Sequence, residues 1–302
     1  MRHMGERLES LQIELESLRL RLLTMQVANV PQQCIKQNEV VFLAEVGSPQ
    51  AQALAHARQV AKQASRTALP SLLLRGTELG LTGREIATAI DFLRHRAPLC
   101  IHVSEPTLHL LASESNYKCY HEIHGKNAGR DSVENIMYND AYLGSQAQEK
   151  IKYGCLNTVN SPHGVQSASV CRYGVCWLEM KDSLRCRVTL HYGDSLGQRG
   201  TSAIGTFENL AHILGSHSDS ELKSIVHVSQ GGTDFISPKR YVEAHYHGPL
   251  ILDRDVYAIH VPTTATTALE AALLQLEARG IKVKRFKPAG PLENAGPVEG
   301  DY

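Results

Sequence analysis

The spacing of apolar residues predicts helices in the first third of the chain. Three segments before Pro98 either repeat apolar residues at steps of three and four or are rich in alanine. They are residues 8–25, Ser48 to Gln63, and Thr82 to Arg96. The third also has a capping-box pattern, because Thr82 in the N-cap position is followed three residues later by Glu85. We therefore expect residues 1–97 to form an N-terminal helical region.

After Pro98 the pattern changes to short runs of apolar and β-branched residues separated by glycine-bearing turns. The runs that predict strands are Leu99 to Val103, Val175 to Met180, Arg187 to Tyr192, Ser224 to Val228, Tyr241 to Gly248, 256–261 and 281–286. Shorter helical stretches lie between them, including Thr206 to Leu214, and a longer helix is predicted from Thr266 to Ala278, closed by Gly280. Strands outnumber crossover helices, so we expect an α+β fold on a mixed or split sheet rather than a doubly wound parallel sheet.

This pattern divides the chain into three predicted regions. The helical region is followed by a sheet-forming domain at residues 98–287, and the glycine- and proline-rich end, residues 288–302, is expected to be a flexible tail. The 31 Lys and Arg residues equal the 31 Asp and Glu residues, so no net field favours nucleic acid or a membrane surface as a partner. Neither an apolar run of membrane-spanning length nor a signal-peptide pattern occurs, which predicts a cytoplasmic location where the protein is made.

The chain lacks the sequence motifs of several common enzyme and binding-site classes. The seven cysteines include no C-x-x-C pair, so we expect reduced thiols rather than a disulfide framework or a zinc knuckle. Phosphate-binding glycine loops and the G-x-S-x-G nucleophile motif are also missing. Two histidine pairs, His121 with His124 and His245 with His247, have ligand-compatible spacing, but neither forms H-E-x-x-H. A His-ligated metal hydrolase stays an alternative, and we expect no metal.

The run "YVEAHYHG", from Tyr241 to Gly248, concentrates titratable groups on one strand. Alternation places Tyr241, Glu243, His245 and His247 on one face, and Val242, Ala244 and Tyr246 on the other. Burying a carboxylate inside a β-rich run costs folding free energy, which a catalytic or binding role would justify. Glu243 is therefore the strongest candidate for a catalytic residue.

Six stretches of the sheet-forming half carry a resemblance to a known family. In chain order they are "APLCIHVSEPTLHLL", "NYKCYHEIHGKNAG", "KYGCLN", "YGVCWLEM", "TLHYGDS" and "YVEAHYHGPLILDRDVYAIHV". The order and the motifs KYG-x-LN, YGDS and Y-x-EA-x-x-HG are similar to those of the CteC-type bacterial effectors, mono-ADP-ribosyltransferases that modify ubiquitin on a threonine. The resemblance spans about two thirds of the chain, Ala97 to Phe286. It differs at "VSEP" after His102, at "HEIHGKNAG", which is one residue longer, and at His245, where the family has glutamine.

The resemblance implies an ADP-ribosyltransferase-like fold, a split mixed or antiparallel sheet beside the N-terminal helices. NAD is the implied co-substrate, and ubiquitin is the implied partner. The implied consequence is that the protein, once secreted into a host cell, blocks ubiquitination there. Glu243 would be the catalytic carboxylate, with His245 beside it as a helper. The residues implied in NAD binding are His102, Tyr120, Glu122, Gly125, Asn127, Tyr153, Gly154, Tyr192 and Asp194.

Chemistry supports Glu243 independently of the resemblance. Breaking the nicotinamide–ribose bond of NAD passes through an oxocarbenium-like state, which a nearby carboxylate stabilises. Each tyrosine could stack on the cationic nicotinamide ring or be a half-buried core residue. His102 could equally be a core histidine, Asp194 could make an Asx turn, and Gly154 could serve a turn. An NAD-glycohydrolase and a catalytically inactive binding module are therefore the alternative functions.

Overall fold

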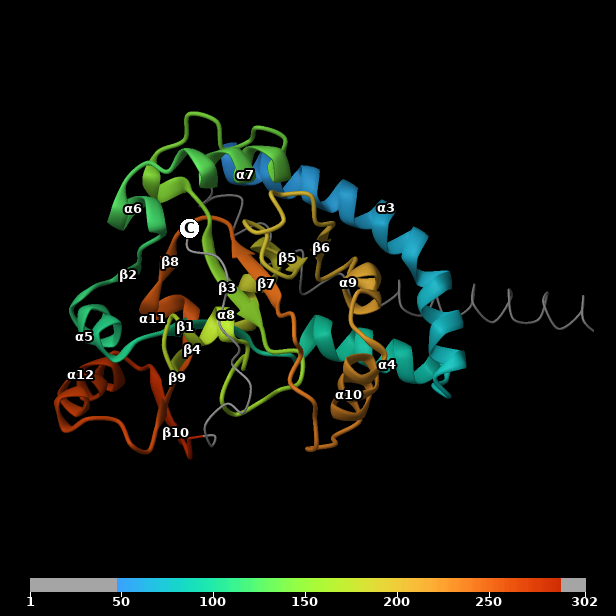
Figure 1. The fold of residues 1–302 in the computed structure, drawn as a ribbon. Coiled ribbons are helices and arrows are strands. Elements are labelled where there is room, and N and C mark those ends of the chain that lie inside the picture. Colours follow the sequence, from blue (N-terminus) through green and yellow to red (C-terminus); the bar gives the residue numbers. More distant parts are fainter. Residues whose placement is uncertain (1–47, 289–302) are drawn as a thin grey trace, which may run out of the picture.

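The computed structural model describes residues 48–288, which form a mixed α/β body around one large sheet (Figure 1). The helix expected at residues 8–25 and nearly all of the expected tail lie outside these residues. No helix within the described range is both long enough and apolar enough to cross a membrane.

The sheet contains eight strands in the order β10-β9-β4-β1-β3-β7-β5-β6. Their bounds are β1 Leu99–Val103, β3 Lys152–Leu156, β4 Cys176–Met180, β5 Val188–Tyr192, β6 Ile204–Thr206, β7 Val242–Tyr246, β9 Val256–Pro262 and β10 Lys282–Phe286. All neighbours are antiparallel except β9 and β10, so the sheet is mixed. A separate two-stranded sheet pairs β2, Asn116–Tyr117, with β8, Leu250–Ile251.

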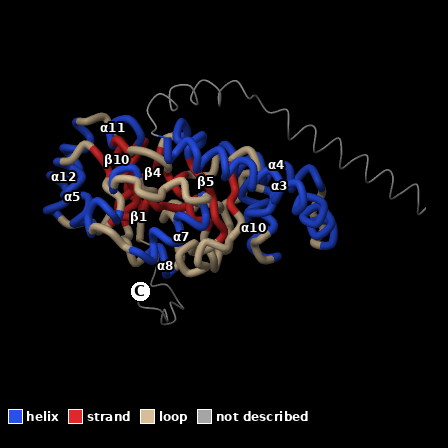
Figure 2. Tube along the Cα trace, turned by 90° about the horizontal axis from the view of Figure 1, so that it is seen from above, coloured by secondary structure: helices blue, strands red, loops and turns tan. Residues whose placement is uncertain are grey.

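Helices cover both faces of the large sheet, as the view from above shows (Figure 2). The longer ones are α3 Ser48–Glu78, α4 Gly83–His95, α5 Glu105–Ser113, α7 Ala128–Tyr138, α10 Asp219–Ser229 and α12 Thr267–Ala278. The shorter ones are α6 Tyr120–His124, α8 Ala168–Cys171, α9 Ala211–Gly215, α11 Leu252–Asp255, η1 Ala147–Glu149 and η2 Asp182–Arg187.

The main hydrophobic core lies on one face of the sheet. Alternate residues of β7, Val242, Ala244 and Tyr246, pack there with apolar side chains of α4, α5, α9, α10 and α12. A smaller cluster on the other face joins the start of α3 to α7 and the residues that follow it. Because α4 packs into the main core, the helical segment before Pro98 and the sheet share one hydrophobic interior.

Most sequence-predicted elements are confirmed, but several differ. The central strand β3 and strand β6 were not predicted, and the helix expected from Thr206 to Leu214 begins only at Ala211. Thr82 caps α4 in the expected capping box with Glu85. Residues 224–228 were predicted as a strand, which is wrong: they lie in α10, because Ser218 and Glu221 form a second capping box that starts a helix there. The helix expected at Ser48 to Gln63 continues to Glu78 and includes Pro70.

Strands β1 and β3 pair over a short length. Their ladder joins Leu99 to Leu156 and Cys100 to Cys155 and then stops. The same register, if continued, would place His102 opposite Tyr153. Strand β3 instead continues its pairing with β7, from Lys152 to Leu156. His102 and Tyr153 therefore lie beyond the end of the β1–β3 ladder.

Candidate functional site

The second face of the central sheet is lined by polar and aromatic side chains. Cross-strand registers align Cys155 and His191 with Glu243, and Tyr153 and Thr189 with His245. On the other side of β3, the same face carries Cys100 and His102 of β1, with Glu179 and Trp177 of β4 opposite them. A row of chemically active side chains thus crosses five adjacent strands, β4, β1, β3, β7 and β5.

Glu243 lies at the centre of this face and is almost completely buried, with 5% of its surface exposed. Its Oε2 atom accepts the backbone N–H of Ser195 at 3.0 Å and lies 2.9 Å from Nε2 of His245. The hydroxyl of Tyr241 donates to Oε1 at 3.4 Å. The loop after β5, which contains "YGDS", therefore anchors the carboxylate of "YVEAHYHG" on β7.

His245 begins a chain of buried hydrogen bonds that extends away from Glu243. Its Nδ1 lies 2.7 Å from the hydroxyl of Tyr138, which is 2.6 Å from Oγ1 of Thr189. Thr189 Oγ1 lies 3.0 Å from Nε2 of His247, and Nδ1 of His247 lies 2.6 Å from the hydroxyl of Tyr142. One set of tautomers satisfies the whole chain, with every donor pointing toward Glu243. Such a one-way chain polarises each bond and strengthens donation to the carboxylate.

Burial dominates the pKa values of this cluster. It raises the pKa of Glu243, opposed mainly by hydrogen bonding from Ser195. Burial, assisted by the charge of Arg130, lowers the pKa of His245 to about 3. It also lowers the pKa of His191 and His247 well below the ordinary value. The three imidazoles are therefore neutral near pH 7 and act as hydrogen-bonding groups rather than as charges.

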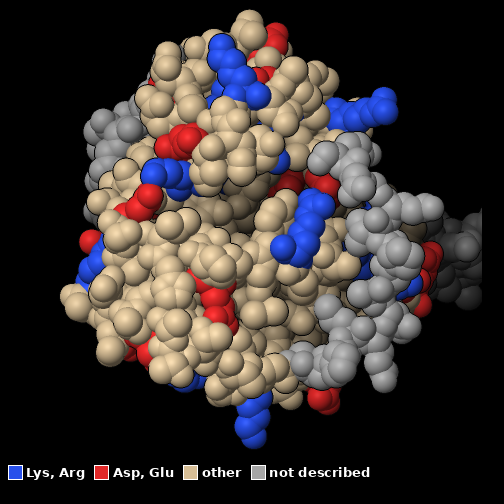
Figure 3. Space-filling view, turned by 60° about the vertical axis from the view of Figure 1, so that its left-hand side comes forward, with Lys and Arg blue, Asp and Glu red and all other residues tan. Residues whose placement is uncertain are grey.

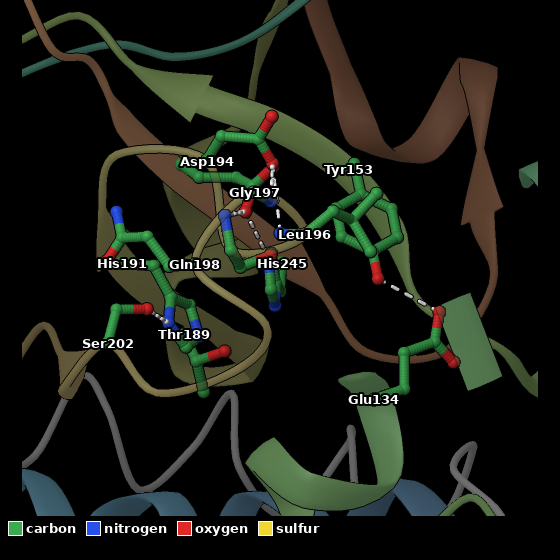
Figure 4. Close-up of polar contacts among 12 residues, drawn as sticks. Glu134, Tyr153, Thr189, His191, Asp194, Leu196, Gly197, Gln198, Ser202 and His245 are labelled. Carbon is green, nitrogen blue, oxygen red and sulfur yellow. Dashed lines mark hydrogen bonds and ion pairs between the residues drawn. The ribbon is translucent and has the colours of Figure 1, made fainter. Parts of the chain in front are cut away.

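Three of the predicted site residues lie near this cluster. The ring of Tyr153 contacts His245 edge-on with 4.6 Å between centroids, and its hydroxyl donates to Glu134 at 2.9 Å (Figure 4). Asp194 accepts the N–H groups of Leu196 and Gly197, an Asx turn that shapes the loop holding Glu243 (Figure 4).

Tyr120 is connected to the cluster through Arg130. The Arg130 guanidinium lies over the ring of Tyr120 at 4.5 Å and over that of Tyr153 at 4.6 Å. This places a cation between two aromatic faces near Glu243, whose pKa it lowers.

The remaining predicted residues serve the fold at other positions. Tyr192 and Gly154 lie on the opposite, apolar face of the sheet, because each is in register with a core residue of β7, Val242 and Ala244 respectively. A side chain at Gly154 would meet the carbonyl of Cys100 at 2.5 Å and the ring of Tyr246 at 2.8 Å. Close packing of three strands thus requires glycine there.

Glu122, Gly125 and Asn127 shape the ends of α6 and α7. Glu122 accepts the N–H of Cys119 at the start of α6, and Gly125 ends that helix at φ +80°. Asn127 caps α7 by accepting the N–H of Arg130. These residues place Arg130 and Glu134, the two charged groups of α7 that approach Tyr153.

His102 lies on the same face as Glu243 but is covered. Its Nε2 accepts the N–H of Val165 at 3.0 Å, and its Nδ1 lies 3.1 Å from the carbonyl of Gly174. The segment from residue 158 to residue 174 packs over it, and Trp177 beside it donates to Pro162. Both ring nitrogens therefore have backbone partners, as in a core histidine.

Sequence reasoning missed several contributors to the site. The sequence did not single out Tyr138, Tyr142, Thr189, His191 and Arg130. Thr189 and His191 had a detectable signal, since they alternate on the strand before "YGDS" and so share one face. Tyr138 gave no comparable signal, because only the packing of α7 on the sheet brings its hydroxyl to His245.

The two candidate metal-ligand pairs are differently placed. His121 is buried beside Asp131 and Glu134, whereas His124 is exposed against Tyr120. His245 and His247 share a face, but hydrogen bonds within the cluster occupy both nitrogens of each ring.

Two surface features accompany the buried site. A shallow, open depression of about 650 Å³ lies on α7 and the turn after it, and its lining includes Asp131, Asn135 and Asp140. In the view of Figure 3 the surface is hollowed near its centre, and Lys and Arg side chains are interspersed with Asp and Glu around it. No broad patch of one charge covers this visible face.

No family model matches the chain, and the curated proteins contain no significant match to it. The geometry of the site therefore carries the functional argument.

Proposed function

We propose that this protein is an NAD-dependent mono-ADP-ribosyltransferase with an ADP-ribosyltransferase-like fold, and that Glu243 is its catalytic carboxylate. One observation carries the proposal: His102, Tyr153 and Glu243 lie on one face of β1, β3 and β7, which are consecutive in the sheet. Transferases of this class use an early-strand histidine or arginine to hold NAD and a late-strand glutamate near the ribose. An aromatic side chain between them can stack on nicotinamide.

The short ladder between β1 and β3 favours the same function. The ladder between these strands ends after Cys100 and Cys155, so no ladder pairs His102 with Tyr153. A split at this position would admit the nicotinamide end of NAD between the histidine and the tyrosine, with Glu243 one strand further on.

The environment of Glu243 suits charge stabilisation. Ser195 and His245 hold one carboxylate oxygen, which leaves Oε1 with a single long contact from Tyr241. A fixed carboxylate in a site with little water stabilises developing positive charge on the ribose more strongly than one in bulk water. We assign His245 to orienting Glu243, because a neutral imidazole with a pKa of about 3 is a weak base toward an acceptor hydroxyl.

Segment 158–174 bears directly on this proposal. It occupies both nitrogens of His102, so NAD can contact His102 only if the segment moves. The same contacts favour a second candidate function, a catalytically inactive binding module in which His102 is a core residue.

Incubation with labelled NAD separates these functions. The transferase proposal expects nicotinamide release together with label on an acceptor protein, and ubiquitin is the acceptor to test first, on a threonine hydroxyl. Nicotinamide release without labelled acceptor indicates an NAD-glycohydrolase. Absence of nicotinamide release under every acceptor condition contradicts the enzymatic proposals and leaves the binding module.

A further inference from the structure

Two cysteines and a histidine converge beneath segment 158–174. Cys100 and Cys155 face each other across β1 and β3, and their sulfur atoms are 3.2 Å apart. His102 follows two residues after Cys100 on the same face of β1. One potential ligand atom from each of the three side chains lies within 4.8 Å of the others. All three residues are at least nine-tenths buried.

The donor set favours a thiophilic ion. Cysteine sulfur and imidazole nitrogen are the ligands that Zn²⁺ takes in proteins, and soft thiolates also select Cu⁺. Binding Zn²⁺ would release the two thiol protons, so two thiolates would balance the charge of the ion and the buried site would stay neutral.

The hydrogen bonds of His102 fit a ligand role. Metal-bound histidines generally donate their second ring nitrogen to a carbonyl or carboxylate, which fixes the ring. His102 has backbone partners on both nitrogens, the carbonyl of Gly174 and the N–H of Val165. The bond from Val165 would give way so that Nε2 binds the ion, and Nδ1–H, donating to the Gly174 carbonyl, would keep the imidazole oriented.

A second cluster offers a useful contrast. His121, Asp131 and Glu134 also bring their ligand atoms within 4.8 Å of one another. There, however, the ammonium of Lys150 lies 2.8 Å from Asp131 and 3.8 Å from Glu134, so a cation of the protein already balances the carboxylates. The thiol cluster has the donors for a metal ion without a lysine among them.

We propose that Cys100, His102 and Cys155 form a binding site for a thiophilic metal ion, with Zn²⁺ as the representative. The site shares His102 with the proposed NAD site, but its test requires no transferase activity. It lies on the face that carries Glu243, since Cys155 is directly opposite Glu243 in the sheet.

The test uses the full chain, reduced and freed of metal by a chelator. Titration with Co²⁺ should give near-ultraviolet thiolate-to-metal charge-transfer bands and strong visible bands of a tetrahedral ion, at one ion per chain. Zn²⁺ should then displace Co²⁺ and abolish these bands. An unsubstituted protein that gives no charge-transfer bands overturns the proposal, and this first step requires no variant to fold.

Variants then locate the site. Cys100→Ser and Cys155→Ser should each reduce the charge-transfer intensity and weaken Zn²⁺ binding by about tenfold or more, measured against a chromophoric chelator. His102→Gln should weaken binding while both thiolate bands persist. Cys119→Ser is the matched control, because Cys119 is equally buried but lies at the start of α6. Bands that persist unchanged in both serine variants, with far-ultraviolet circular dichroism unaltered, would assign the metal elsewhere and overturn the proposal.

Discussion

Nε2 of His245 lies 2.9 Å from Oε2 of Glu243, and the two residues are two positions apart on the same strand. The pair is buried, and the imidazole is oriented from its other nitrogen by Tyr138. This arrangement holds Oε2 of the carboxylate and leaves Oε1 with one long hydrogen bond, from the hydroxyl of Tyr241.

Replacing Glu243 should abolish the proposed activity while preserving the fold. Glu243→Gln keeps the size of the side chain and removes its charge, and loss of one such electrostatic stabiliser typically lowers the rate by about a hundredfold or more. Nicotinamide release from labelled NAD is the measurement. Glu179→Gln is the control, because Glu179 is a carboxylate on the same sheet face that is bound to His260 and Lys284 instead. Equal rates for the two variants would remove Glu243 from the mechanism.

The hydroxyl of Tyr138 should contribute substantially to stability. Tyr138→Phe leaves His245 and Thr189 each without one buried hydrogen-bond partner. An unsatisfied buried polar group costs about 1–3 kcal/mol, so the free energy of unfolding in urea should fall by about that amount. Tyr173→Phe removes a hydroxyl from a ring that is 53% exposed and should change stability by no more than about 0.5 kcal/mol. A Tyr138→Phe protein as stable as the Tyr173→Phe protein would contradict the hydrogen-bond chain.

Gly154 should be required for packing. Gly154→Ala places a methyl group 2.5 Å from the carbonyl of Cys100, a backbone atom that can move only with β1. Overpacking of this kind typically costs about 1–3 kcal/mol. Gly129→Ala is the matched control, because its new methyl would have its nearest contact at 3.5 Å, with the side chain of Asn127. Thermal unfolding of both variants, with NAD affinity measured beside it, checks the claim. Unchanged stability with lost NAD affinity would instead support the cofactor role expected from the sequence.

Local sequence patterns predicted the elements better than they predicted the site. The capping box of Thr82 and Glu85 and the alternation of "YVEAHYHG" depend on neighbours in the chain, and both are confirmed. Ser218 and Glu221 carry the same kind of signal, and this capping box outweighs the strand-like apolar pattern of residues 224–228.

The site depends on contacts that no local pattern encodes. Ser195 and Glu243 are 48 residues apart, and Tyr138 and His245 are 107 residues apart. Such pairs meet only through the order of strands in the sheet and the packing of α7 above it. The burial of a histidine likewise cannot be predicted from its neighbours in the chain. The sequence therefore allows two roles for His102, an NAD-binding residue or a core residue.

Acid should destabilise the protein between about pH 6.5 and pH 3. A histidine in the unfolded chain has a pKa of about 6.5, whereas that of folded His245 is about 3 because burial disfavours its charged form. Within this window the unfolded chain binds a proton that the folded chain does not. Stability is therefore full above pH 6.5 and falls as the pH decreases, by about 1.4 kcal/mol per pH unit for each such histidine.

His191 and His247 act in the same direction, because burial also lowers the pKa of each. Glu243 acts in the opposite direction: its pKa is raised, so the folded chain takes up that proton first, and its contribution is greatest at low pH and offsets part of the loss. Urea unfolding at pH 7, 6 and 5 should show a declining free energy of unfolding. His247→Gln removes one such proton, so it should make the slope of the free energy of unfolding against pH less steep by up to about 1.4 kcal/mol per pH unit. His109→Gln, at an exposed position of α5, controls for the substitution itself. A free energy of unfolding that is constant from pH 7 to pH 5 would show that these imidazoles are not buried in their neutral form.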